Sequence, residues 1–83
     1  MRVTILYFAN LRERRGAASD LLDLPPGGDV AMALATIAKL HPGIAAQLPH
    51  AQVAVNLALV AATTPLSDGD ELALIPPVSG GAS

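Results

Sequence analysis

The stretch DLLDLPPGGDVAMALATIAKLHPG, residues 20–43, decides the fold class. Its first five residues, three of them leucine, predict a short strand that the turn residues Pro-Pro-Gly-Gly at 25–28 bring to an end. Asp29 predicts a helix N-cap, because its carboxylate can accept hydrogen bonds from the first free N–H groups of a helix. Pro42-Gly43 stops that helix. One helical face is predicted from the spacing of Val30, Ala33, Leu34, Ile37, Ala38 and His41.

Upstream of this stretch, the chain predicts one strand and one loop. Residues 2–8 are β-branched and aromatic, and both of their alternating sets are largely apolar, which favours a strand covered on both faces. Residues 10–16 are polar and charged, and they predict a solvated loop that connects two strands of a hairpin. No glycine-rich cradle accompanies the charges, so a phosphate site is not predicted there.

Downstream of the helix, three segments predict strands. Residues 52–56 predict one strand, and residues 57–60 predict a very short strand that returns beside it. Residues 71–75 predict a last strand, which Pro76-Pro77 ends because proline cannot extend a ladder of backbone hydrogen bonds. Asp68-Gly69 supplies turn chemistry just before this strand.

The resulting order is strand, strand, helix, strand, short strand, strand, which predicts an α+β domain. The most economical packing of this order is a β-grasp (ubiquitin-like) roll, a mixed sheet of about five strands with one main helix around a single core. We assign residues 1–75 to this domain and residues 76–83 to a flexible C-terminal tail that carries Gly-Gly.

Composition narrows the classes of function. Eighty-three residues without cysteine allow one small domain and exclude a disulfide framework, a thiolate metal site and a cysteine nucleophile. The net charge of −2, with only five lysines and arginines, argues against a nucleic-acid surface. The longest apolar run is far shorter than a membrane span requires. We therefore expect a cytoplasmic protein without nucleic-acid or membrane partners.

The chain offers few side chains for catalysis. His41 and His50 lack metal-ligand spacing, and a histidine at a helix end more often interacts with the helix dipole than acts as a general base. Asp68, Asp70 and Glu71 cluster around a glycine turn, and turn formation accounts for them. We expect no catalytic side-chain site, no metal and no bound cofactor in this chain.

The C-terminal residues are the informative segment. Pro76-Pro77 stiffens the exit from the last strand and directs the chain away from the sheet. Ser79, Gly80 and Gly81 are slim, so they can enter a narrow channel and bring the backbone close to another protein's active site. A frayed terminus is the alternative explanation of such a composition.

Three stretches together resemble one family. RVTILYFANLRE (2–13), AVNLALV (54–60) and PLSDGDELALIPPVSGG (65–81) are similar to the small subunits of molybdopterin synthase, the MoaD-type sulfur carriers. The sulfur carriers of thiamine biosynthesis share the β-grasp order and a Gly-Gly end, but they usually lack the Pro76-Pro77 step. They stay open as an alternative, as does a ubiquitin-like modifier or binding module.

The resemblance implies a function for the tail. An E1-like enzyme uses ATP to adenylate the carboxylate of Gly81, and a sulfur donor converts the acyl-adenylate to a thiocarboxylate. The thiocarboxylate then delivers sulfur to cyclic pyranopterin monophosphate in the large synthase subunit, and two transfers make the dithiolene of molybdopterin. In this scheme the chain is a non-catalytic subunit of a transferase complex, expected as a heterotetramer, and it needs no cysteine.

The resemblance also implies the partner contacts. An exposed apolar patch against the large subunit maps onto Phe8, Leu59 and Ile75, although strand alternation also allows them to be core residues. The acidic cluster at 68–71 could form a rim toward the activating enzyme, and a turn explains it equally well. The tail residues expected in the interface are Pro76, Pro77, Val78 and Ser79, with Gly80 and Gly81 at the reacting end.

One departure from the family pattern lies at the end of the chain. The family ends at the second glycine, whereas Ala82 and Ser83 follow Gly81 here. With them attached, Gly81 has a peptide carbonyl and no free carboxylate to adenylate. Three explanations are open: a protease trims the two residues, they are a remnant of expression, or the protein is an inactive relative. We favour trimming or a remnant, because the rest of the tail fits the family closely.

Overall fold

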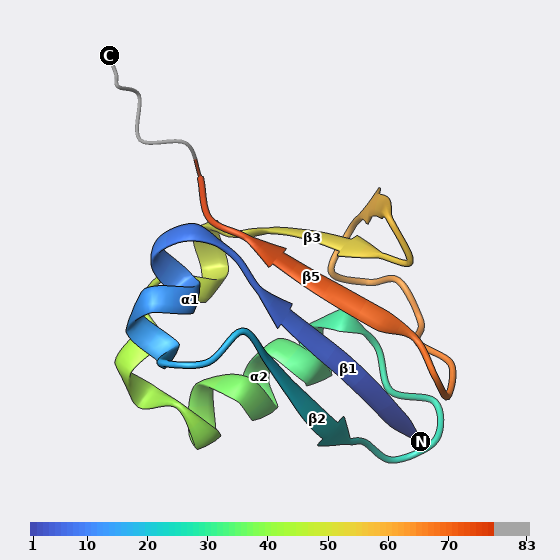
Figure 1. Cartoon of the computed structure of the whole chain (residues 1–83). Helices are drawn as coiled ribbons and strands as arrows, with labels where there is room; N and C mark the ends of the chain where they lie inside the picture. The colour runs from blue at the N-terminus through green and yellow to red at the C-terminus, as the bar shows by residue number, and fades with distance from the viewer. Residues whose placement is uncertain (78–83) are drawn as a thin grey trace.

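The predicted strands form one mixed sheet, and the computed structural model describes residues 1–77 of the chain. From edge to edge the strand order is β2-β1-β5-β3-β4 (Figure 1). The two central strands, β1 and β5, pair in parallel, and each other pair of neighbours is antiparallel. This is the predicted β-grasp arrangement, with the last strand beside the first. The elements are β1 (Arg2–Tyr7), α1 (Ala9–Arg15), β2 (Ser19–Asp23), α2 (Val30–Leu40), the 3-10 helices η1 (Pro42–Ile44) and η2 (Leu48–His50), β3 (Gln52–Val55), β4 (Ala58–Val60) and β5 (Glu71–Ile75).

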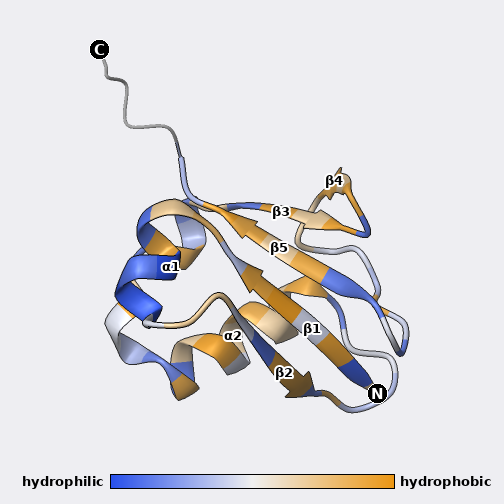
Figure 2. Ribbon diagram, in the orientation of Figure 1, coloured by the Kyte–Doolittle hydropathy of each residue, from blue (hydrophilic) through white to orange (hydrophobic). Residues whose placement is uncertain are grey.

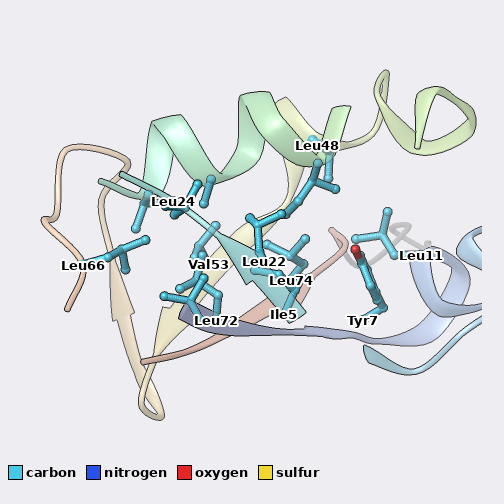
Figure 3. Close-up of a cluster of buried hydrophobic side chains, with 14 of the residues drawn as sticks. Ile5, Tyr7, Leu11, Leu22, Leu24, Leu48, Val53, Leu66, Leu72 and Leu74 are labelled. Carbon is cyan, nitrogen blue, oxygen red and sulfur yellow. The ribbon is translucent and has the colours of Figure 1, made fainter. Parts of the chain in front are cut away.

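The core lies between one face of the sheet and α2 (Figure 3). Alternate residues of the central strands, such as Ile5, Tyr7 and Leu74, are almost fully buried on this face. α2 contributes Val30 and Ile37 to the same cluster, at the helical spacing that the sequence predicts. Burial of each large apolar side chain stabilises the fold by about 1.5–3 kcal/mol, which is how so short a chain holds its sheet.

The helix α2 begins and ends where the sequence predicts. The Asp29 carboxylate accepts a hydrogen bond from the Met32 N–H at 2.9 Å, as expected of an N-cap. The helix ends at Leu40, and the His41 N–H still donates to the Ile37 carbonyl at 2.8 Å before Pro42 turns the chain. No helix within residues 1–77 has the length and apolar character needed to cross a membrane.

The prediction of a loop over residues 10–16 is wrong, because α1 is a helix of seven residues. Leu11 is fully buried and fixes this helix to the core. The helix ends at Gly16, whose φ of +79° is the left-handed conformation that glycine adopts without strain. Its start gives no sequence signal, because Phe8 at the N-cap has no side-chain oxygen to offer the free N–H groups.

The turn between β3 and β4 also differs slightly from the expectation. The predicted short strand over 57–60 begins one residue later, because Asn56 and Leu57 have φ values of +49° and +74° and form the turn. Two left-handed residues in succession match the twist of a tight hairpin, in which Asn-Gly is the preferred pair. Leucine replaces glycine here, and its side chain is 93% exposed.

Candidate functional site

The face of the sheet opposite α2 carries a row of apolar side chains. Strand register places Leu6 beside Ala73, Ala73 beside Ala54, and Ala54 beside Leu59, so the row crosses four strands. Side chains alternate along a strand, and the sequence neighbours of this row point into the core. The row therefore points away from α2.

Two larger residues continue this surface toward one end of the sheet. Ile75 follows the core residue Leu74 in β5, and Phe8 follows the core residue Tyr7 in extended backbone, so both point to the outer face. We call this surface the outer apolar patch and define it by Leu6, Phe8, Leu59, Ala73 and Ile75; Ala54 lies in the same row but is buried.

One part of the outer apolar patch, formed by Phe8 and Ile75, lies at the end of the sheet where the described chain leaves it. Because β1 and β5 are parallel, both strands finish at this end. Phe8 follows β1 directly, and Ile75 closes β5 and is followed by Pro76-Pro77 (Figure 1). Whatever binds the residues beyond Pro77 therefore approaches the protein next to this patch.

The structure separates the core interpretation from the surface interpretation of the predicted patch residues. Phe8 is 45% exposed and Leu59 is 65% exposed, so neither belongs to the core. Ile75 is half-buried, and it pairs with Gln52 of β3. Phe8, Leu59 and Ile75 thus lie on one face of the sheet. Phe8 and Ile75 lie at the end that carries Pro76-Pro77, whereas Leu59 lies level with Ala73 in the middle of β5.

The predicted reacting end lies outside the described residues. This concerns Val78, Ser79, Gly80 and Gly81, and also Ala82 and Ser83. The assignment of residues 76–83 to a tail therefore stays a prediction.

Sequence reasoning missed two members of the patch. Leu6 and Ala73 were not predicted as surface residues, because the two alternating sets of their strands are both apolar. A period-two count divides β1 and β5 into two sets but does not say which set faces outward. The structure does, since Ile5, Tyr7 and Leu74 fill the core and leave the intervening positions for the outer face.

A polar cluster fixes α1, the helix that begins directly after Phe8. The Asp20 carboxylate accepts from the Tyr7 hydroxyl at 2.8 Å and from two nitrogens of Arg15 at 2.8 Å each. The His41 Nε2 lies 3.1 Å from the same carboxylate. One side chain of β2 thus connects β1, α1 and the end of α2, which holds the backbone around Phe8 in place.

The electrostatics of this cluster follow from its hydrogen bonds. The Arg15 guanidinium holds the pKa of the Asp20 carboxyl below its usual range, and the Tyr7 hydroxyl acts in the same direction. Burial raises the pKa of the Tyr7 phenol, and donation to the Asp20 carboxylate raises it further. Neither group therefore titrates near neutral pH, and the cluster is suited to a structural role rather than to proton transfer.

The acidic cluster at 68–71 lies at the opposite end of the sheet from Pro76-Pro77. Asp68 accepts from the Arg2 N–H at 2.7 Å, and Asp70 accepts from the Ser67 N–H at 2.8 Å. The Asn56 side chain donates to Asp70 at 2.9 Å and accepts from the Glu71 N–H at 3.1 Å. These bonds tie the turn before β5 to the β3–β4 turn, so turn formation explains the AVN and DGDE stretches.

The arrangement within residues 1–77 suits docking. This part of the chain holds no group of three histidine, cysteine, aspartate or glutamate residues that could bind a metal ion. A hollow of about 430 Å³ lies between α2 and β4, and apart from Gln52 it is lined by apolar residues such as Leu34, Leu48 and Val60. What the fold presents is an apolar surface beside the exit of the main chain.

The sequence matches a family model and curated relatives over almost its whole length. The model described as the ThiS family matches residues 5–81, which ends at the second glycine of the Gly-Gly pair. The molybdopterin synthase sulfur carrier subunit of Chlamydomonas reinhardtii is 36% identical over 83 residues, covering 98% of this chain and 100% of that protein.

Solved structures with the same fold include a small archaeal modifier protein and a subunit of molybdopterin-converting factor. The crystal structure of small archaeal modifier protein 1 (SAMP1) from Haloferax volcanii has a TM-score of 0.90 and 30% identity, and the match covers 98% of this chain and 100% of that chain. A chain in the complex of subunits 1 and 2 of molybdopterin-converting factor from Helicobacter pylori has a TM-score of 0.70 and 28% identity, with 98% and 100% covered.

Proposed function

The chain belongs to the ThiS family, and from this membership we propose that it is the sulfur-carrier subunit of a molybdopterin synthase. The observation that carries the proposal is the 36% identity to a molybdopterin synthase sulfur carrier subunit, in a match that covers all of that protein. The outer apolar patch beside Pro76-Pro77 supports it, because a carrier needs a docking surface next to the group that it delivers.

The proposed chemistry takes place on the main chain. The carboxylate of Gly81, once it is the terminus, attacks the α-phosphorus of ATP in an E1-like enzyme, and pyrophosphate leaves. A donor of sulfide-level sulfur attacks the resulting acyl carbon, AMP leaves, and a thiocarboxylate remains. Adenylation is required because a carboxylate is a poor electrophile and AMP is a good leaving group. This chain itself binds no cofactor, and ATP serves the activating partner.

Delivery requires a second partner, the large synthase subunit. The outer apolar patch docks on it while the tail enters its active site. There the thiocarboxylate sulfur attacks a side-chain carbon of cyclic pyranopterin monophosphate, the C–O bond at that carbon breaks, and its oxygen substituent leaves. Water then releases the acyl group, and the chain leaves as a carboxylate. Two carriers supply the two sulfurs of the dithiolene, which fits a heterotetramer. A cytoplasmic location fits this ATP-dependent activation.

The deciding experiment measures the intact mass of the chain ending at Gly81 after incubation with ATP, the activating enzyme and a sulfur donor. We expect the mass to rise by the difference between sulfur and oxygen. The matched control ends at Gly80, and the form that ends at Ser83 should stay unchanged until Ala82 and Ser83 are removed. An unchanged mass for the Gly81 form would contradict the sulfur-carrier function.

Two other functions make different predictions in the same system. The TM-score of 0.90 to a small archaeal modifier protein favours a protein modifier as the second candidate. A modifier would form lysine-linked conjugates after ATP activation, which appear as products of higher mass on a denaturing gel. A carrier of thiamine biosynthesis would form the thiocarboxylate but would not copurify with the large synthase subunit.

A further inference from the structure

The charged side chains of this protein are segregated along the sheet. One half of the molecule, which we call the exit half, contains α1, the C-terminal part of α2 and the ends of β1 and β5 that lead to Pro76-Pro77. The other half, which we call the far half, contains the starts of β1 and β5 and the N-terminus of α2. Every charged residue lies in residues 1–77 and can be assigned to one half.

The exit half is basic. It holds four of the five lysines and arginines and only two of the seven acidic residues. Asp20 already pairs with Arg15 at 2.8 Å, which leaves Glu13 as the remaining acid of this half. In Figure 2 the hydrophilic part of α1 is seen beside the apolar ends of the strands. The basic residues are Arg12, Arg14, Arg15 and Lys39.

The far half is acidic. Its one basic side chain, Arg2, pairs with Asp23 at 2.9 Å. The remaining acids stay unneutralised by lysine or arginine within residues 1–77, although several of them accept backbone hydrogen bonds. They are Asp29, Asp68, Asp70 and Glu71. A protein with a net charge of −2 is therefore positive at one end and strongly negative at the other.

The cations of α1 are available to a partner. Arg12 and Arg14 are exposed, and neither forms an ion pair within residues 1–77. Their position near the C-terminus of α1 also stabilises the helix dipole modestly. The helix dipole of α1 does not explain why most of the acidic residues lie in the far half.

We propose that the basic exit half is a docking surface for an acidic surface of the large synthase subunit, which surrounds the opening that takes the tail. The inference rests on the proposed function and adds the chemistry of the partner's surface. Complementary charge raises association rates by orienting an encounter before contact. The polarity found here turns the exit half, with its apolar patch, toward a negative surface and turns the far half away from it.

The experiment measures association and dissociation rates with the large subunit over a series of NaCl concentrations. For wild type, the association rate should fall steeply as salt shortens the Debye length below ~10 Å. The double variant Arg12→Glu/Arg14→Glu should associate about tenfold more slowly at low salt, with dissociation changed less than about twofold. Thermal melts of each variant check that α1 remains folded.

Two single variants make the test specific. Arg14→Gln neutralises the charge that Arg14→Glu reverses, so it changes the net charge by half as much. Its effect on the logarithm of the association rate should therefore be half as large. Arg2→Glu is the matched control, because it changes the net charge by the same amount as Arg14→Glu but lies in the far half. It should not slow association.

The outcomes separate this inference from the proposed function. Wild type that binds with a salt-independent association rate overturns the electrostatic docking and leaves the sulfur-carrier function intact. Equal slowing by Arg2→Glu and Arg14→Glu overturns it too, because net charge would then explain the effect. Wild type that fails to bind the large subunit at every salt concentration contradicts the proposed function itself.

Discussion

At the scale of single residues, Asp20 stabilises the fold, whereas Leu57 lowers its stability. Asp20 satisfies its carboxylate through Tyr7, Arg15 and His41, which come from three different elements. Leu57 has a left-handed backbone and an exposed side chain, so it contributes strain and no burial. Asp20 therefore stabilises the fold by connecting segments that are distant in the sequence, whereas Leu57 lowers stability at its own turn.

Asp20→Asn tests the polar cluster. The folded pKa of Asp20 is lowered, so its stabilisation is present above the ordinary carboxyl pKa of about 4 and is lost as the pH falls through the folded value. We expect the free energy of unfolding at pH 7 to drop by about 1–3 kcal/mol, measured by urea denaturation. The difference from wild type should shrink at pH 3, and a constant difference would contradict this account. Asp23→Asn, in an exposed pair with Arg2, should change little.

Leu57→Gly tests the strained turn. Glycine adopts a φ of +74° without the steric cost that a Cβ adds, so the free energy of unfolding should rise by about 0.5–1 kcal/mol. Leu57→Ala is the control, because it removes the exposed side chain but keeps the Cβ, and it should bring no such gain. Thermal melting distinguishes them, and an equal gain from alanine would attribute the effect to the exposed side chain.

At the scale of elements, α2 and β5 could be predicted from sequence, whereas α1 could not. Asp29 and Pro42 mark the two ends of α2 locally, and Pro76 marks the end of β5. The helix α1 is stabilised instead by burial of Leu11 and by the pairing of Arg15 with β2, which no local pattern reveals. Its polar residues therefore read as a loop.

Leu11→Ala tests how far α1 depends on that burial. The side chain is fully buried, so its truncation should lower the free energy of unfolding by about 2–5 kcal/mol in urea denaturation. Leu40→Ala is the matched control, because Leu40 is 58% exposed at the end of α2 and should cost much less. Similar losses from both variants would mean that α1 is not anchored by Leu11.

At the scale of the whole molecule, the candidate site depends on how distant segments combine. The resemblance indicated Phe8, Leu59 and Ile75, but their exposure follows from the strand register and from the side of the sheet that α2 covers. The segregation of charge likewise requires the parallel pairing of β1 with β5, which brings α1 to the end that leads to Pro76-Pro77. Neither property is visible in a linear sequence.

Phe8→Asp tests the outer apolar patch. The variant removes a phenyl group that the complex would bury and puts a carboxylate in its place. Binding to the large subunit should therefore weaken by at least about tenfold in Kd, measured by titration calorimetry. The fold should persist, because Phe8 is 45% exposed in the isolated chain. Leu57→Asp places the same charge on an exposed leucine of the β3–β4 turn, at the end of the sheet away from Pro76-Pro77, and should bind normally. Unchanged binding by Phe8→Asp would remove the patch from the interface.

The parallel pairing of β1 with β5 also has a mechanical consequence. A partner that grips the residues beyond Pro77 pulls along β5, a strand hydrogen-bonded on both sides, to β1 and to β3. Such a force runs parallel to both ladders and loads their hydrogen bonds together in shear, instead of opening them one at a time. A pull on the C-terminal end can therefore withdraw the protein from a deep binding channel without separating the strands of its sheet.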